Sequence, residues 1–178
     1  ACGADMSLPK NKKNKPIQQA IKTRHVECLK ILLAKSSRST SETKDFTPIM
    51  IAINNFQPDA VPILLEAGED PSVFTPQNIL IFFYFNKCAL GLACFQQQVG
   101  VVQALCDKMS NIDLPFGYQD QGAVHWICSS HNPEIARIIL SKGGVDVNRL
   151  DKEGRMGPYY MLDVGKEEEN IEVLELLF

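Results

Sequence analysis

The sequence predicts an all-α solenoid of about five helix-turn-helix pairs stacked side by side. Two observations lead to this fold class. A unit of two short helical patterns recurs along the chain at a spacing near 33 residues, with one longer step. The clearest copy, residues 117–154, also carries start and stop signals for its helices. Units of this kind bury their apolar sides against their neighbours, so the whole array supplies the core.

Residues 117–154 show how one unit is built. Residues 123–130 form a short apolar run, long enough for two turns of helix. Asn132–Pro133 then begins a second helix, because Asn is a good N-cap and Pro suits the first helical position. Residues 135–139 carry isoleucines at i, i+3 and i+4, and Gly143–Gly144 ends that helix. The unit therefore reads as helix, tight turn, helix, and an extended loop that reverses at its tip.

The other units follow from aligning their first helices. These helices start at Pro16, Pro48, Ala89, Ala123 and Gly157. The longer step lies between Pro48 and Ala89, which places an insertion after the second unit.

This pattern resembles the ankyrin repeat family, whose repeats read roughly D-x-x-G-x-T-P-L-H-x-A, a helix break, and E-V-V-x-L-L-L-x-x-G-A-D-V-N. The matching residues are Phe46-Thr47-Pro48-Ile49 with Ala52, Val124-His125 with Glu134-Ile135 and Ile138-Ile139-Leu140, and Gly143, Asp146-Val147-Asn148, Asp151 and Gly154. Four units replace the family's first-helix histidine, by Gln18, Met50, Gly91 and Tyr159. The resemblance covers nearly the whole chain and implies helix pairs joined by β-hairpin-like loops.

The resemblance also implies a division of the chain. Gly3–Ser7 matches the family's G-A-D-V-N, so we expect residues 1–15 to be the tail of a preceding repeat. The sequence stops at Phe178 within an apolar helical pattern, so we expect it to belong to a longer array. The expected repeats are 16–45, 46–87 with a long apolar insertion, 88–119, 120–153 and 154–178, the last incomplete.

Three local features depart from a regular repeat. Pro62 lies within the second helix of its unit and should bend or shorten that helix. Glu167–Glu169 is expected in a solvated loop between the two helices of the last unit. The insertion contains Ile79–Phe85, seven consecutive apolar residues. That run could pack onto the array, pair as a hydrophobic hairpin, insert into a membrane, or form a partner or self-association site.

Composition narrows the class of protein. The chain has 178 residues, 45% of them apolar, and a net charge of −3, which gives no general case for nucleic-acid binding. Residues 1–38 hold nine Lys and Arg against two acidic residues, while the remainder holds nine against nineteen. This charge asymmetry has two possible meanings. The charges either lie on solvated faces without a further role, or they steer an acidic or dipolar partner by long-range attraction.

The cysteines and the hydropathy indicate in which compartment of the cell the protein is expected. None of the six cysteines stands in a C-x-x-C pair, and most fall at apolar helix positions, as buried thiols in a reducing compartment do. Residues 1–16 lack the apolar core of a signal peptide, and no apolar run approaches 18 residues. We therefore expect a cytoplasmic protein without a membrane span.

No catalytic constellation is evident. His25, His125 and His131 all fall at positions with structural roles in the family. His125 and Cys128 share one helix face at i, i+3, which keeps a divergent hydrolase as an alternative. The sequence contains no phosphate-binding loop and no zinc-spaced Cys/His set. We expect a non-enzymatic protein without cofactor or metal.

The resemblance implies a protein-protein interaction module that binds a partner on a concave face of hairpin tips and first helices. Alternatives are a passive spacer within a longer ankyrin scaffold, or self-association through Ile79–Phe85. In the family, contact positions lie at the turn tips and late in the first helix. Transferred by offset, they are Lys12, Asn14, Lys22, Thr23, Thr43, Lys44, Phe46, Asn54, Asn55, Tyr84, Phe85, Phe95, Gln96, Tyr118, Gln119, Ser129, Ser130, Lys152, Glu153 and Arg155. The aromatic residues among them would gather mid-array, as hot spots do.

Overall fold

The computed structural model describes residues 16–35, 47–73, 88–114, 120–161 and 165–178. Its helices form five pairs within these ranges, the last of which begins with a 3₁₀ helix, η1. The pairs are α1 (Pro16–Lys22) with α2 (Val26–Lys35), α3 (Pro48–Asn54) with α4 (Ala60–Glu66), α5 (Ala89–Phe95) with α6 (Val99–Lys108), α7 (Ala123–Ser130) with α8 (Pro133–Lys142), and η1 (Gly157–Met161) with α9 (Glu167–Leu177).

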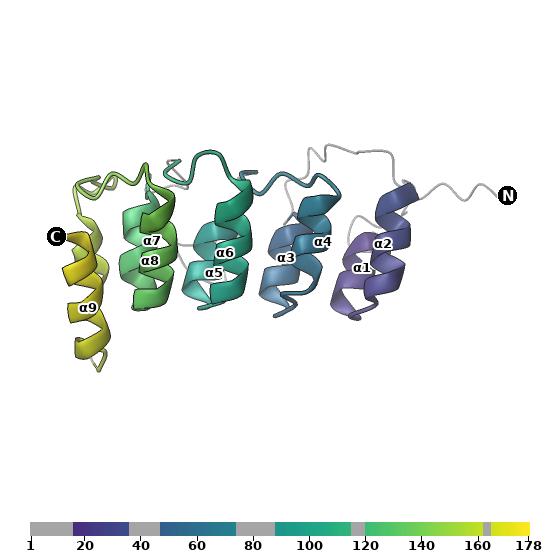
Figure 1. The fold of residues 1–178 in the computed structure, drawn as a ribbon, viewed down its shortest axis with the longest axis horizontal. Helices are drawn as coiled ribbons and strands as arrows, with labels where there is room; N and C mark the ends of the chain where they lie inside the picture. Colours follow the sequence, from purple (N-terminus) through teal and green to yellow (C-terminus); the bar gives the residue numbers. More distant parts are fainter. Residues whose placement is uncertain (1–15, 36–46, 74–87, 115–119, 162–164) are drawn as a thin grey trace, which may run out of the picture.

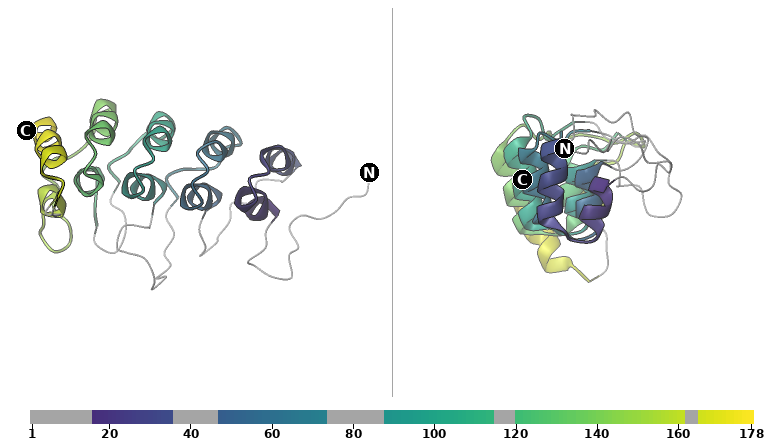
Figure 2. Two further views of the ribbon diagram at one scale, coloured as in Figure 1. Left: turned by 90° about the horizontal axis from the view of Figure 1, so that it is seen from below. Right: turned by 90° about the vertical axis from the view of Figure 1, so that its right-hand side faces the viewer.

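The pairs follow one another in chain order along the long axis of the molecule (Figure 1). The first members, α1, α3, α5, α7 and η1, contact one another in sequence and form one row. The second members, α2, α4, α6, α8 and α9, form the other row in the same way. Figure 2 shows the two rows from below and from one end. The predicted all-α solenoid is confirmed.

Local chemistry explains where several helices begin. The Thr47 hydroxyl caps α3 by accepting a hydrogen bond from the Met50 backbone N–H at 3.2 Å. Cys88 occupies the equivalent place before α5, where its Sγ accepts from the Gly91 N–H at 3.2 Å. The Asn132 side chain accepts from the Glu134 N–H at 2.9 Å at the start of α8. The cap predicted at Asn132 is therefore confirmed, and Thr47 plays the same role at α3.

The turn inside each of the first four pairs uses a left-handed residue. Arg24, Phe56, Gln97 and His131 have φ values of 58°, 51°, 55° and 51°. A residue with a side chain adopts this conformation at some energetic cost, so the shared conformation reflects a turn that recurs with the repeat.

Pro62 shortens α4, as predicted. The helix begins only at Ala60, which makes Pro62 its third residue, and it ends at Glu66. The missing N–H of a proline costs little in the first turn, where the N–H has no partner inside the helix.

The loop predicted at Glu167–Glu169 was wrong, whereas the predicted exposure of these residues to solvent is confirmed. These residues form the exposed first turn of α9 and do not belong to a loop. Carboxylates are favoured there because the N-terminal end of a helix is positively polarised.

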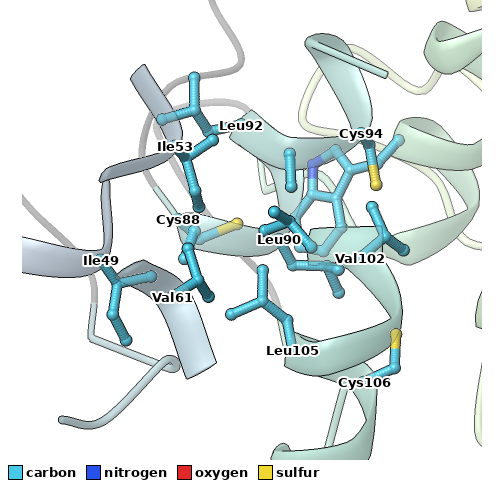
Figure 3. Close-up of a cluster of buried hydrophobic side chains, with 14 of the residues drawn as sticks. Ile49, Ile53, Val61, Cys88, Leu90, Leu92, Cys94, Val102, Leu105 and Cys106 are labelled. Atoms are coloured by element: carbon cyan, nitrogen blue, oxygen red, sulfur yellow. The ribbon is translucent and has the colours of Figure 1, made fainter. Parts of the chain in front are cut away.

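The core lies between the helix pairs and runs the length of the array. Ile49 and Ile53 from α3 belong to the same buried cluster as Leu90 and Leu92 from α5 (Figure 3), and all four side chains are at most 2% exposed. Each pair thus depends on its neighbours to keep its apolar side out of water.

Candidate interaction surface

The structure describes eleven of the twenty predicted contact residues. The other nine lie outside the described ranges and are Lys12, Asn14, Thr43, Lys44, Phe46, Tyr84, Phe85, Tyr118 and Gln119. Residues 79–85, proposed above as a self-association site, lie outside those ranges as well.

Four described contact residues occupy equivalent places at the ends of successive first helices. Lys22, Asn54 and Phe95 are the last residues of α1, α3 and α5, and all three are exposed. Ser129 near the end of α7 is half-buried. Because the first helices stack in one row, these side chains form a line along the array, which we call the helix-end row.

The residues that follow Lys22 and Asn54 bond back to a carbonyl of their own helix. Asn55 is half-buried, and its amide donates at 2.7 Å to the Ile51 carbonyl, which also accepts the Asn55 backbone N–H at 3.1 Å. The exposed Thr23 hydroxyl makes the same type of bond to the Gln19 carbonyl at 2.9 Å.

Ser130 departs from its predicted role as a contact residue. It is only 1% exposed, and its hydroxyl donates to the Ile127 carbonyl at 2.8 Å. The side chain therefore stabilises the end of α7 and does not belong to the accessible surface.

Glutamine side chains tie the helix-end row together across units. The Gln96 amide donates to the Asn54 side chain at 3.4 Å, and the Gln98 amide donates to the Ile53 carbonyl at 2.8 Å and to Gln96 at 2.7 Å. In the next junction, the Gln97 amide donates to the Ser130 carbonyl at 3.2 Å. These bonds fix the turns of the second, third and fourth pairs relative to one another.

The tip of the loop before η1 is built around a buried carboxylate. The Asp151 side chain is 0% exposed. One oxygen accepts from the backbone N–H groups of Glu153 and Arg155 at 2.8 and 2.9 Å. The other accepts from Arg155 Nε at 2.8 Å and from the Tyr160 hydroxyl at 2.6 Å.

This hydrogen-bond network shifts the pKa values of two groups in it, the Asp151 carboxyl and the Tyr160 hydroxyl. Burial by itself would raise the pKa of Asp151, but the hydrogen bonds from Tyr160, Arg155 and the backbone lower it to about 2. Burial and the neighbouring Asp151 carboxylate raise the pKa of Tyr160 to about 12. Asp151 thus stays ionised and Tyr160 stays protonated at neutral pH.

Three predicted contact residues lie at this tip. Lys152 and Glu153 are exposed. Arg155 is 21% exposed, and it bonds to Glu153 at 2.6 Å as well as to Asp151. Arg155 therefore supports the tip and also lies at its surface.

His125 and Cys128 are not arranged as a nucleophile and its base. Both are 0% exposed. His125 Nδ1 accepts from the Gly122 N–H at 3.1 Å, which leaves Nε2 to donate to the Arg155 carbonyl at 3.2 Å. Burial lowers the pKa of His125 and raises that of Cys128 to about 12, so the ring is neutral and the thiolate is disfavoured. The histidine joins α7 to the loop before η1.

The buried thiols should be inert toward alkylating reagents. Cys88, Cys94, Cys106 and Cys128 are buried, and burial raises the pKa of each, to about 12 for Cys88 and about 11 for Cys106. Because the thiolate is the reactive form, iodoacetamide at pH 8 should modify none of these four in the native chain. The exposed Cys28 should react readily. Peptide mapping before and after denaturation tests this, and early modification of any of the four would contradict it.

Sequence reasoning missed several exposed apolar side chains. Phe56, in the turn after α3, is 60% exposed, Tyr159 of η1 is 54% exposed and Met156 is 39% exposed. The Arg155 guanidinium lies 5.1 Å from the centroid of the Tyr159 ring. The signal available in the sequence was that Phe56 is an aromatic residue in the turn between the two helices of its unit.

Within the described ranges, no group of three or more His, Cys, Asp and Glu side chains could hold a metal ion. No helix among the described residues is long and apolar enough to cross a membrane.

Comparison with known proteins supports the same kind of array. Residues 1–75 match the family model described as ankyrin repeats (3 copies). The Ankyrin repeat and KH domain-containing protein mask-1 of Caenorhabditis elegans is 26% identical over 147 residues, a match that covers 78% of this chain. This chain spans only 5% of the length of that relative.

A solved structure shares the fold. The structure is the Bd0816 predatory endopeptidase from Bdellovibrio bacteriovorus in complex with immunity protein Bd3460. One chain in it matches with a TM-score of 0.77, over 98% of this chain and 86% of that one, at 13% identity. The recurring helix pairs, the family match over residues 1–75 and the likeness to an ankyrin-repeat relative all support an ankyrin-repeat array.

Proposed function

We propose that this chain is a non-catalytic interaction module that binds a protein partner along the helix-end row and the adjoining loop tips. The observation that carries the proposal is the row itself, in which Lys22, Asn54, Phe95 and Ser129 present side chains from four successive units. Ankyrin repeats are in general protein-binding modules. The solved structure with the same fold is also a complex of two proteins.

Phe95 is the residue we propose as the anchor of this surface. It is 46% exposed at the end of α5, in the third of the five pairs. Polar side chains surround it in the row, with Asn54 and Gln96 on the side of the second pair and Ser129 in the fourth. An aromatic side chain with a polar rim is the usual arrangement of a binding hot spot.

Hydrogen bonds along the helix-end row favour a surface that is already ordered before a partner binds. The amides of Gln96, Gln97 and Gln98 link the turns of three neighbouring units by hydrogen bonds. A surface that is already ordered loses less conformational entropy when a partner binds. We further propose a reducing compartment such as the cytoplasm, because the four buried cysteines are held as thiols.

Replacing Phe95 by alanine should weaken partner binding about fivefold or more, because truncating a hot-spot residue costs over about 1 kcal/mol. The thermal stability should change little, since this side chain is nearly half exposed. The test compares proteins captured by the native chain and by the variant, followed by titration of the purified partner against both.

Ile31→Ala is the matched control. Ile31 is also a large exposed side chain, at 59%, but it lies on α2 in the other row of helices. The control should retain the partner. A partner held equally by the native chain and Phe95→Ala would show that the helix-end row is not its site. A large loss of thermal stability in Phe95→Ala would make Phe95 a core residue. A chain that captures no specific protein would instead be a spacer.

A further inference from the structure

The turns that join the two helices of each pair lie along one edge of the array. In the first four pairs these turns are residues 23–25, 55–59, 96–98 and 131–132, and α9 begins on the same edge. In Figure 1 this edge is the lower one, opposite the points where α2, α4, α6 and α8 end. We call it the turn edge, and it contains the helix-end row.

Hydrogen bonds connect the turn edge from the second pair to the fifth. The glutamine bonds described above join the turns of the second, third and fourth pairs. His131 Nδ1 lies 2.8 Å from Asn170 Oδ1, which joins the fourth turn to α9. The Asn170 amide in turn donates to the Met161 carbonyl at 2.7 Å. The edge is therefore a continuous surface over four units, held in one arrangement before any ligand binds.

Two aromatic side chains are exposed in the middle of this edge. Phe56 lies in the turn of the second pair and is 60% exposed, and Phe95 ends α5 in the third pair. The bond between Gln96 and Asn54 joins these two turns. Both pairs have a described pair on either side, so the packing of neighbouring units does not cover the two rings. Exposed apolar side chains that gather in this way mark an interaction surface.

The conformation of Phe56 adds to this argument. Its φ value of 51° lies in the left-handed region, which suits asparagine better than a bulky aromatic residue. Because the ring is exposed, burial inside the fold does not offset the cost of this conformation. The position is therefore better explained by a ring that contacts a ligand than by a ring that serves the turn alone.

Charge is segregated along the turn edge. Lys22 and Arg24 are exposed on the first pair, and neither forms an ion pair with another residue that the structure describes. Glu167–Glu169 are exposed on the first turn of α9 and also lack an ion pair within the described ranges. Residues 95–100 of the third pair contain no charged side chain. Two further acidic residues of this edge are Asp59 and Glu134. The net charge is thus positive only at the first pair.

We propose that the turn edge binds an extended polypeptide segment whose own charges are segregated in the opposite order. Its acidic end lies on Lys22 and Arg24, its apolar middle on Phe56 and Phe95, and its basic end on the start of α9. Charge complementarity at both ends fixes the direction of the segment, because the reverse direction would bring like charges together. The inference rests on the proposed function, to which it adds the kind of partner and its direction.

The exposed amides favour an extended segment over a helix. Asn54 Nδ2 and Gln97 Oε1 form no hydrogen bond with another described residue. An extended backbone offers open N–H and C=O groups to such amides, whereas a helix bonds most of these groups internally. Five stacked units span roughly 40 Å at about 8–10 Å per step, and about twelve extended residues at roughly 3.3 Å each cover that distance.

The main test is selection of peptides from a random library displayed on phage, with peptides long enough to span the edge. The native chain serves as the bait. The selected peptides should carry Asp and Glu toward one end, aromatic or aliphatic residues in the middle, and Lys and Arg toward the other end. Fluorescence anisotropy with the synthetic peptides then measures their affinity, which should fall as the salt concentration rises.

Exchanges of charge test the direction of binding. Arg24→Glu should weaken the selected peptides about fivefold, because it replaces an attraction by a repulsion. Lysines at the acidic end of the peptide should restore the affinity for this variant, whereas changes at the basic end should not. Glu168→Lys should show the converse and be restored by glutamates at the basic end alone. Lys108→Glu is the matched control, since Lys108 is exposed where α6 ends on the opposite edge. This variant should bind the peptides as the native chain does at the same salt concentration.

Phe56→Asn separates binding from folding. It should weaken the peptides about fivefold or more, as expected for the loss of an anchor. The melting temperature should stay the same or rise, because asparagine adopts the left-handed conformation more readily. A lower melting temperature with unchanged affinity would show that Phe56 serves the turn and would overturn its role as an anchor.

The outcomes distinguish this inference from the proposed function. A selection that yields no peptide, peptides without segregated charges, or affinity restored by changes at the wrong end would each overturn the inference. Peptides that lack charge order but lose affinity for Phe95→Ala would leave the proposed function in place. Peptides held equally by the native chain and Phe95→Ala would overturn both.

Discussion

Asp151→Ala should lower the free energy of unfolding by about 3 kcal/mol, because removing one partner of a buried ion pair leaves the other groups unsatisfied. The Asp151 side chain accepts hydrogen bonds from two backbone N–H groups, Arg155 and Tyr160, and has no exposed surface. Its loss should also displace Lys152 and Glu153 at the loop tip. Urea denaturation followed by the fluorescence of Trp126, the only tryptophan, measures the change.

The contribution of Asp151 depends on pH in a defined direction. Its pKa is about 2 in the folded chain and about 3.9 when unfolded. Between these values the unfolded state binds more protons, so the contribution is complete above about pH 5 and is lost as the pH falls toward 2. The stability difference between the native chain and Asp151→Asn should therefore shrink between pH 5 and pH 3.

His125 adds a second dependence of the same sign. Burial lowers its pKa from 6.5, so the unfolded chain takes up a proton before the folded chain does. Stability should thus begin to fall as the pH drops below about 6.5, before Asp151 titrates.

Glu153→Ala provides the control for the Asp151 variant. Glu153 pairs with the same arginine at 2.6 Å, but its side chain is 54% exposed. An exposed ion pair contributes less than about 1 kcal/mol, so this change should have a small effect. Equal losses in the two variants would show that burial of the Asp151 carboxylate is not what stabilises the tip.

Gly157→Ala should cost about 2 kcal/mol, within the usual range for an overfilled contact. An added Cβ would lie 2.8 Å from Val124 Cγ2, 3.0 Å from Cys128 Sγ and 3.1 Å from the Val124 carbonyl oxygen. The carbonyl belongs to the backbone of α7 and cannot turn aside, so η1 must move away. Gly157→Val should be more destabilising than Gly157→Ala.

Gly100→Ala is the matched glycine control. Gly100 lies in α6, and an added Cβ would meet no atom within 4 Å. This change should stabilise the chain by roughly 0.5–1 kcal/mol, because alanine favours the helix. Hydrogen exchange should localise the Gly157 effect to η1, α9 and α7, since each repeat contacts only its neighbours. Equal loss of protection in α1 and α2 would contradict this.

The sequence by itself determined the all-α repeat architecture and the order of the helix pairs. These features depend on local chemistry, namely the recurring apolar spacing, the caps at Thr47 and Asn132, and the shortening of α4 by Pro62. Local signals of this kind act within a few residues and can be read along the chain. The exposed positions of Lys22, Asn54 and Phe95 also followed from their place in the repeat.

Only the tertiary structure decided which contact residues remain accessible and which side chains hold the units together. Ser130 is buried, and Arg155 is held by the Asp151 carboxylate four residues earlier in its own loop. The bonds of Gln97 and Gln98 reach residues more than 30 positions away. Such pairings arise when neighbouring units pack, since the distance between two side chains in space is set by the stack and not by their separation in the chain.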